Sequence, residues 1–345
     1  MDIFRKELDT FDGHTVTQIT LVNDNGVEIS CLTMGAIWQA FNVPSGAGKK
    51  NLLLSFDHTK DYYANAQNIC KVIGRVAGRI AHGKCELNGE QVQLPQNENG
   101  NTLHGGANGF STYNWNYTTS RNKNSVSVIF QKKITEKMDG FPGNILATII
   151  YTLNNNNKVT IAFSALGGSK DSLFNPTNHV YFNLSDHQDL SSHSLKINSS
   201  VTLETDENNI PTGRVKDVED TPLDFREFRN VKVAADEADG FDDAFVVNQP
   251  GKGTEPIAVL RDEDSGRQIT IDSDRNGLVM YNMPALDTEI KFTRDQGKPA
   301  IPGEGLALEA QTLPDAINQE NFGDIILPKN GKRSYHIQFA YDKIK

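Results

Sequence analysis

A histidine in the middle of the chain stands in a segment that alternates like a β-strand. The segment Asn175–Leu184 reads NPTNHVYFNL, so His179, Tyr181 and Asn183 share one face of a strand. The residues of the other face are mostly apolar, as expected for a face that packs on a core: Asn178, Val180, Phe182 and Leu184. This parity favours an imidazole that lines a site over a histidine buried in the core.

A glutamate near the C-terminus stands in a second apolar, strand-like segment. Gly305–Ala316 reads GLALEAQTLPDA, with Glu309 among leucine and alanine residues. Burial disfavours a carboxylate, so it raises the pKa of a glutamate toward that of a useful general base. The alternative is a glutamate on an edge strand that points into water.

Two glycine-rich segments in the first third of the chain carry further polar candidates. Gly74–Ala81 reads GRVAGRIA, and the spacing of Arg75 and Arg79 fits either a basic helix face or two structural ion pairs. Asn101–Gly106 reads NTLHGG, where His104 precedes two glycines. Glycine lets a backbone approach a ligand closely, although a turn histidine without a function has the same appearance.

The elements that must position these side chains are predicted to be β-strands. Val16–Leu21 and Val27–Leu32 alternate on either side of an Asn-Asp-Asn-Gly turn, which predicts a hairpin. Asn-Gly pairs favour turns with positive φ, and six occur, at Asn25, Asn88, Asn99, Asn108, Asn276 and Asn330. Helical periodicity is confined to 59–65. The sequence therefore predicts many antiparallel connections and no parallel α/β sheet.

Further strands are predicted at Ser125–Phe130, Ile145–Leu153, Lys158–Ala165, Ser194–Leu203 and Arg333–Tyr341. Strand patterns resume after the polar stretches 250–253 and 295–299, which are therefore interpreted as surface loops. We expect an all-β fold with few short helices, in which residues 1–345 form one large antiparallel β-sandwich domain. The outer face of one sheet would be available to a ligand.

The composition restricts the partners. The 345 residues carry a net charge of −10, which disfavours nucleic acid or an anionic membrane as the main partner. The chain has no apolar run long enough to span a membrane and no signal peptide at its start. Cys31, Cys70 and Cys85 form no CxxC pair, which indicates reduced cysteines and a cytoplasmic location.

Taken in order, these segments resemble the aldose 1-epimerase family. The matching stretches are GRVAGRIA at 74–81, NTLHGG at 101–106, NPTNHVYFNL at 175–184, DGFDDAF at 239–245 and LEAQTLPDAINQ at 308–319. The resemblance covers about residues 12–341. It implies a galactose-mutarotase-like β-sandwich that needs no metal and no organic cofactor, and whose partner is a small reducing sugar.

The resemblance also implies roles for particular residues. Glu309 matches the general base of the family and His179 its general acid. Three further residues match side chains that hold the sugar: Arg79, His104 and Asp242. Asp243 is adjacent to Asp242, and opposite strand parity would let only one of the two face the site. Tyr281 is a candidate for the aromatic platform that family members often carry late in the chain.

The implied reaction exchanges the two anomers of a cyclic sugar. The proton on O1 is removed and ring oxygen O5 is protonated, so that the ring opens, C1–C2 rotates, and the hydroxyl adds to the other face. One base and one acid suffice, and each such group typically contributes ~10²–10⁴-fold. The sequence leaves open the preferred sugar (galactose, glucose, xylose or maltose) and the oligomeric state.

Four other functions are alternatives to anomer exchange. An iron site built from His104, His179 and Glu309 lacks a His-x-His pair or a carboxylate at ligand spacing. A glycoside hydrolase needs paired carboxylates, which an acidic chain can supply, so only the ordered motifs disfavour it. A non-catalytic sugar-binding protein has no need of both His179 and Glu309. A hexose-phosphate epimerase needs clustered cations, and Arg75 and Arg79 leave that possibility open.

Overall fold

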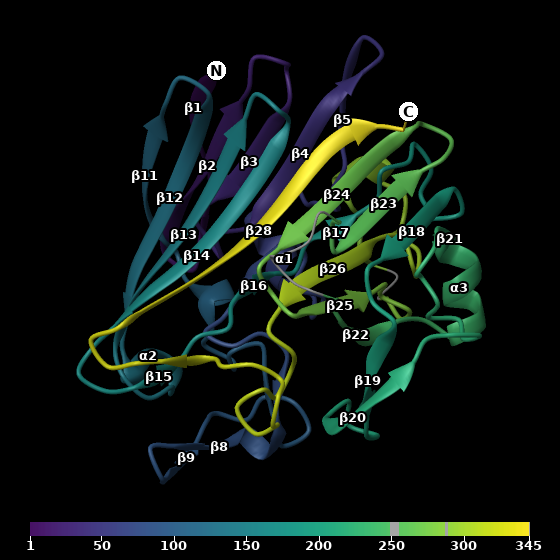
Figure 1. Ribbon diagram of the computed structural model, residues 1–345. Helices are drawn as coiled ribbons and strands as arrows, with labels where there is room; N and C mark the ends of the chain where they lie inside the picture. The colour runs from purple at the N-terminus through teal and green to yellow at the C-terminus, as the bar shows by residue number, and fades with distance from the viewer. Residues whose placement is uncertain (249–254, 287–288, 345) are drawn as a thin grey trace.

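The computed structural model of the chain describes residues 1–248, 255–286 and 289–344 and is dominated by antiparallel sheets (Figure 1). The largest sheet has nine strands, in the order β11 (Asn116–Arg121), β12 (Ser125–Ile134), β13 (Ile145–Asn154), β14 (Lys158–Gly167), β28 (Lys332–Lys343), β24 (Arg267–Ser273), β23 (Ala258–Asp262), β18 (His193–Ile197) and β21 (Arg229–Asn230). The long strand β28 thus joins a meander of early strands to a group of later ones.

Two smaller sheets complete the frame. A five-stranded meander contains β1 (Asp2–Phe11), β2 (His14–Val22), β3 (Glu28–Leu32), β4 (Trp38–Ser45) and β5 (Gly48–Asn51). A six-stranded sheet has the order β17 (Tyr181–Phe182), β26 (Leu306–Gln311), β25 (Gly277–Tyr281), β22 (Asp242–Val246), β19 (Val201–Thr205) and β20 (Pro211–Asp217).

Short elements connect the sheets. Four two-stranded pairs are formed by β6 (Val72–Ile73) with β16 (Thr177–Asn178), β7 (Arg79–Ile80) with β10 (Thr102–Leu103), β8 (Lys84–Leu87) with β9 (Glu90–Gln93), and β15 (Ser172–Leu173) with β27 (Ile326–Leu327). The α-helices in the described residues are α1 (Thr59–Tyr63), α2 (Glu136–Asp139) and α3 (Val231–Ala238). None of the helices within the described ranges is long and apolar enough to cross a membrane.

The core lies between the nine-stranded sheet and the two smaller sheets. Strand β13 shows the alternation that produces it, because every second residue is buried and the residues between them are more exposed; the buried ones are Ile145, Ala147, Ile149, Tyr151 and Leu153. The ring centroid of Phe339 in β28 lies 5.2 Å from that of Trp38 in β4 and 5.6 Å from that of Phe182 in β17. Residues of all three sheets therefore pack together, and the expected all-β sandwich is confirmed.

Most of the predicted strands are present with shifted ends, but the one predicted at Ser194–Leu203 is wrong. The chain forms two strands there, β18 in the nine-stranded sheet and β19 in the six-stranded sheet. Between them, the Ser199 hydroxyl donates to the carbonyl of Val246 at 2.6 Å, across the crossing point. Apolar residues alternate on both sides of the break, so periodicity alone did not reveal it.

Two of the six Asn-Gly pairs have the expected geometry at both residues. Asn88-Gly89 joins β8 to β9, and Asn99-Gly100 closes the bridge between Glu98 and Asn101, with positive φ at both residues of each pair. Two consecutive positive φ angles are the signature of the tight turn that matches strand twist. The short helix expected at 59–65 is also present, as α1. The loop expected at 250–253 lies outside the described residues.

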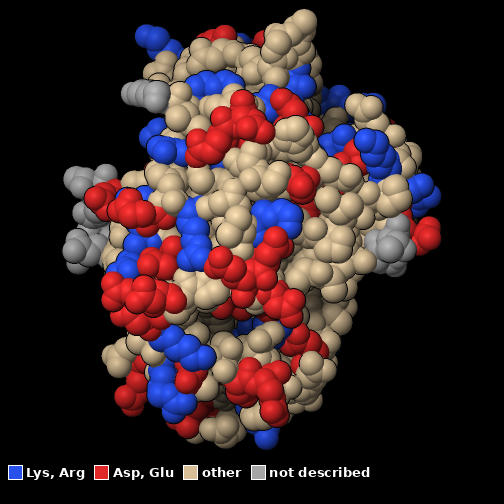
Figure 2. Space-filling model, turned by 90° about the vertical axis from the view of Figure 1, so that its right-hand side faces the viewer, with Lys and Arg blue, Asp and Glu red and all other residues tan. Residues whose placement is uncertain are grey.

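Acidic and basic side chains are interspersed on the face shown in Figure 2. No continuous basic surface is visible over the described part of that face. This distribution agrees with the negative net charge of the chain. That nucleic acid is not a partner stays a prediction.

Candidate active site

A cavity of about 500 Å³ opens on the face of the six-stranded sheet that points away from the main core. Strands β22, β25 and β26 form its floor, and segments 66–68, 78–79 and 97–104 and the β19–β20 hairpin contribute walls. The six residues expected to carry function all line it: Arg79, His104, His179, Asp242, Tyr281 and Glu309. The volume is in the range of small-molecule sites, about 300–1,000 Å³.

His179 and Glu309 are direct neighbours at the cavity floor. Nε2 of His179 lies 3.3 Å from Oε1 of Glu309, and the two side chains are 7% and 2% exposed. The segments that carry them are tied together, since the amide of Asn175 exchanges two hydrogen bonds with the main chain of Thr312, both 3.0 Å. The Thr177 hydroxyl also donates to a β26 carbonyl at 2.9 Å. The imidazole and the carboxyl group are therefore held in fixed relative positions.

The continuous strand expected at 175–184 is wrong in detail. β16 ends at Asn178 and β17 begins at Tyr181, so His179 lies in the short connection between them. His179 and Tyr181 both line the cavity as their parity indicated. Asn183 does not, because its amide is buried and donates to the carbonyls of Gln188 and Glu304 at 2.9 and 2.8 Å. Hydrogen bonds to these main-chain carbonyls hold Asn183 in the interior. A pattern of side chains in the sequence cannot reveal main-chain acceptors.

Burial controls the protonation of the pair. It lowers the pKa of His179 to about 3, and the charge of Lys71 adds to the lowering. It raises the pKa of Glu309 well above its ordinary value, with a further contribution from the charge of Asp242. Both shifts disfavour the charged form of each group and so favour a state in which the pair holds a single proton. Transfer of that proton between Oε1 and Nε2 interconverts the neutral pair and the carboxylate–imidazolium pair.

Arg79 and Asp242 form a polar cluster at the wall of the cavity. Nε and Nη2 of Arg79 donate to the two carboxylate oxygens of Glu98, both at 2.8 Å. Nη1 of Arg79 lies 3.7 Å from Oδ2 of Asp242, which also accepts a hydrogen bond from Asn209 at 3.0 Å. The bidentate contact fixes the guanidinium plane and leaves Nη1 directed toward the aspartate.

The register of the floor strands distinguishes Asp242 from Asp243. Asp242 is paired with Tyr281, and Val279, two residues before Tyr281, is paired with Glu309. Because side chains alternate along a strand, Asp242, Tyr281 and Glu309 project from the same face. Asp243 has the opposite parity, although it touches the cavity edge. Burial, with the neighbouring Asp242 charge, raises the pKa of Asp243 to about 6.

His104 is held against Gly78 through its ring and its main chain. The ring Nδ1 accepts a hydrogen bond from the N–H of Gly78 at 3.3 Å, and the backbone N–H of His104 donates to the carbonyl of Gly78 at 3.0 Å. Burial lowers its pKa well below the ordinary value, followed by the effect of His179, so the ring is neutral. With Nδ1 as acceptor, the proton is on Nε2. The ring centroid lies 5.4 Å from that of His179.

The glycine directly after His104 allows two backbone segments to approach each other, whereas the sequence suggested the close approach of a ligand. Gly105 has a φ of +85°, and a Cβ there would lie 2.0 Å from the carbonyl oxygen of Gly74. The close approach is thus between two backbone segments. It holds the His104 turn against the Gly74–Ala81 segment.

Two tyrosines form an aromatic wall beside the histidine. The ring of Tyr181 stacks on that of His179 with centroids 5.0 Å apart, and Tyr281 meets the same imidazole edge-on at 6.3 Å. The hydroxyl of Tyr281 donates to the side chain of Gln67 at 3.3 Å. Tyr281 therefore lines the cavity, and its use as an aromatic platform for a sugar stays a prediction.

With this geometry established, the comparisons with known proteins identify the family. The family model for aldose 1-epimerase matches residues 17–340. The chain belongs to the aldose 1-epimerase family. It is 47% identical over 335 residues to aldose 1-epimerase from Streptococcus thermophilus, a match that covers 96% of this chain and 95% of the relative. It is 37% identical to maltose epimerase from Levilactobacillus brevis, over 99% and 100% of the two chains.

Solved structures agree. An aldose epimerase homologue from C. elegans superimposes with a TM-score of 0.86 at 27% identity, covering 95% of this chain and 99% of the other. The galactose 1-epimerase of Lactobacillus acidophilus has the same fold, with a TM-score of 0.86 at 24% identity over 100% and 99% of the chains. The resemblance stated from the motifs is confirmed, and the chain is an isomerase of the aldose 1-epimerase type.

The two arginines of Gly74–Ala81 differ in location. Neither lies on a helix, and both form ion pairs. Nε of fully buried Arg75 donates to Asp139 at 2.6 Å, and its Nη1 donates to the carbonyl of Gly143 at 2.7 Å. Arg75 therefore anchors the segment in the interior, while Arg79 reaches the cavity. The spacing in the sequence did not distinguish these two locations.

Sequence reasoning missed several residues that line the cavity: Gln67, Glu98, Asn209 and Gln311. For Gln311 a signal was present, since it has the strand parity of Glu309, two positions away. Glu98 and Asn209 come from loops whose position depends on the whole fold. Within the described residues, no group of three His, Cys, Asp or Glu side chains is arranged to hold a metal ion.

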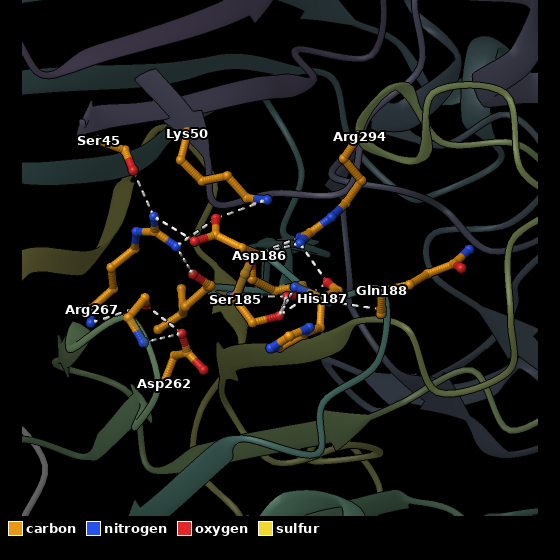
Figure 3. A network of polar contacts seen from close by, with 12 residues as sticks. Ser45, Lys50, Ser185, Asp186, His187, Gln188, Asp262, Arg267 and Arg294 are labelled. Atoms are coloured by element: carbon orange, nitrogen blue, oxygen red, sulfur yellow. Dashed lines mark hydrogen bonds and ion pairs between the residues drawn. The ribbon is translucent and has the colours of Figure 1, made fainter. Parts of the chain in front are cut away.

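A polar network supports the segment that follows β17 (Figure 3). Arg267 donates to Asp186 at 3.1 Å and to the Ser45 hydroxyl at 2.8 Å, and Lys50 lies 3.3 Å from the same aspartate. Arg294 donates to the carbonyl of Ser185 at 2.8 Å. The network joins β5 and β24 to the segment after β17, and so stabilises the position of that segment.

Proposed function

We propose that the chain interconverts the α and β anomers of a reducing hexose such as galactose or glucose, with Glu309 as general base and His179 as general acid. The observation that carries this proposal is the 3.3 Å contact between Nε2 of His179 and Oε1 of Glu309 on the floor of a sugar-sized cavity. The two reacting oxygens, O1 and O5, are bonded to the same carbon. An acid and a base this close together can reach both oxygens.

The reaction starts from the carboxylate–imidazolium form of the pair. Glu309 takes the proton from O1 while His179 donates a proton to O5, the C1–O5 bond breaks, and the C1–O1 bond becomes a carbonyl. Rotation about C1–C2 turns the other face of the carbonyl toward O5. His179 then takes back the O5 proton as the ring closes, and Glu309 returns a proton to O1. The enzyme ends in its starting state.

The remaining residues are proposed to bind the sugar. Nη1 of Arg79 and the carboxylate of Asp242 form a donor–acceptor pair suited to adjacent hydroxyl groups. The neutral ring of His104 offers its Nε2–H as a donor. Tyr281 presents an aromatic face against which an apolar face of the sugar can pack.

The charges around the cavity favour an unphosphorylated sugar. Among the described residues that line it, Arg79 is the single Lys or Arg, and Glu98 and Asp242 already neutralise it. A phosphate group would meet four carboxyl groups: Glu98, Asp242, Asp243 and Glu309. The cavity therefore offers no site for the phosphate of a hexose phosphate.

Polarimetry tests this function directly. Freshly dissolved α-galactose and α-glucose should reach their equilibrium rotation faster with the protein than without it, in proportion to its concentration. Glucose 6-phosphate should show a kcat/KM at least tenfold lower than that of glucose. Binding of these sugars without any change in the rate would instead indicate a sugar-binding protein of the same fold.

A further inference from the structure

A glutamine in the wall of the cavity holds the hydroxyl groups of both tyrosines beside His179. The hydroxyl of Tyr181 donates to the main-chain carbonyl of Gln67 at 2.9 Å, and that of Tyr281 donates to its side-chain Oε1 at 3.3 Å. The N–H of Gln67 donates in turn to the side chain of Asn65 at 3.0 Å. Gln67 is therefore held at three points, and the proposed mechanism gives it no role.

The carboxamide of Gln67 has one free end. Its oxygen accepts the hydrogen bond from Tyr281, while its Nε2 donates to no other group in the described part of the chain. The side chain is half-buried and lines the cavity. An amide N–H is a donor that suits the oxygen of a sugar hydroxyl. Gln67 therefore offers the cavity a neutral donor beside the aromatic wall.

The order of the strands shows on which side of the cavity floor this donor lies. Tyr181, Tyr281 and Asp242 stand in one row across β17, β26, β25 and β22. Neighbouring strands are about 4.8 Å apart, so the first and last residues of the row are separated by about 14 Å. The ring of Tyr281 lies 6.4 Å from that of Tyr181, which stacks on His179. Gln67 and His179 are therefore at the β17 end of the floor, and Asp242 is at the β22 end.

We propose that Gln67 binds the primary hydroxyl O6 of an aldohexose through its amide N–H. This inference rests on the proposed function, in which His179 protonates O5 and Glu309 takes the proton of O1. In a pyranose ring C1 is bonded to O5 and C2, and the carbon that carries C6 is bonded to O5. A ring with O5 at His179 therefore directs C6 toward the β17 end of the floor, where Gln67 lies. It directs C2 and C3 toward Asp242.

This contact has a consequence for the choice of sugar. A pentose such as xylose has no C6, so the amide of Gln67 gains no partner when that sugar binds. Galactose and glucose both carry O6 and differ only at C4, so the amide does not distinguish between them. One neutral hydrogen bond corresponds to about a 3- to 10-fold difference in a binding constant. Gln67 therefore favours hexoses over pentoses by about that factor.

The test compares glucose with 6-deoxyglucose, which lacks only O6, by polarimetry on the wild-type protein, on Gln67→Met and on Gln91→Met. Methionine keeps the length of the side chain and removes its hydrogen bonds. For Gln67→Met we expect kcat/KM for glucose to fall about 3- to 10-fold, and that for 6-deoxyglucose to stay within twofold of the wild-type value. The wild-type preference for glucose should thus disappear. Gln91 is exposed on β9, so its substitution should change neither value.

Two results would overturn the assignment. An equal loss for both sugars would show that Gln67 acts through the tyrosines that it holds and not on O6. An unchanged kcat/KM for glucose would show that its amide makes no contact with the substrate. Failure of the proposed function would look different, because the wild-type protein would then accelerate the mutarotation of neither sugar.

Discussion

At the scale of single residues, the site is defined by one proton shared between two buried groups. Desolvation pushes the pKa of His179 down and that of Glu309 up, so the pair resists both gain and loss of a proton. Groups this close titrate as a unit, and the limbs of a pH profile belong to the pair. The structure therefore predicts a broad range of pH in which the reactive one-proton state persists.

This protonation behaviour predicts the pH profile. Activity should fall on the acidic side when the pair takes up a second proton, at the His179 pKa of about 3 or at the acid limit of the fold. It should fall on the alkaline side when the pair loses its single proton, at the raised pKa of Glu309. Polarimetric kcat/KM values should therefore show no inflection near the ordinary histidine pKa of about 6.5. An inflection there that disappears in His179→Gln would contradict the shared-proton description.

At the scale of elements, strand register decides which side chains meet. Parity along residues 175–184 placed His179 and Tyr181 on the face that lines the cavity, but it placed Asn183 there too, and Asn183 is buried elsewhere. Glu309 was found by its apolar surroundings and by the family motif. The pairing of β22, β25 and β26 is a property of the sheet, and only the structure supplied it. For the same reason the crossing between β18 and β19 could not be read from a continuous apolar pattern.

The register makes a prediction about the two adjacent aspartates. Asp242→Asn should raise KM for glucose about 10-fold or more, since it removes a charged acceptor on the face that carries Glu309. Asp243→Asn should have less than a threefold effect on KM, because that side chain has the opposite parity. Steady-state kinetics of both variants on one sugar make the comparison. The reverse order of effects would show that Asp243 is the residue that binds the sugar.

A second prediction concerns the buried ion pair of Arg75 and Asp139. Asp139→Asn leaves the Arg75 guanidinium buried without a charged partner, which typically destabilises a fold by about 3–5 kcal/mol. Arg75 does not line the cavity, so KM of the folded variant should stay within threefold of the wild-type value. Urea unfolding and kinetics at low temperature measure the two effects separately. A large rise in KM with unchanged stability would place this pair in the site.

At the scale of the whole molecule, the sequence allowed the fold class and the family to be predicted because five motifs occur in the correct order along the chain. It could not supply the walls of the cavity. Glu98 and Asn209 reach Arg79 and Asp242 from loops whose positions follow from the packing of three sheets. The loops that fix the cavity's size also limit which sugar enters. That residues 1–345 form a single domain stays a prediction.

The central claim is that Glu309 is the general base, and Glu309→Gln with polarimetric measurement of kcat tests it most directly. Glutamine keeps the size of the side chain but cannot accept the O1 proton, so kcat should fall by ~10²–10⁴-fold. The melting temperature should rise, by the equivalent of ~0.5–2 kcal/mol, because the fold no longer has to bury this carboxyl group. Burial raises the pKa of Glu309, so the wild-type fold loses stability as the pH rises above about 4.5, and the glutamine variant does not have this loss. A folded Glu309→Gln protein that keeps more than about half of the wild-type kcat would contradict the account.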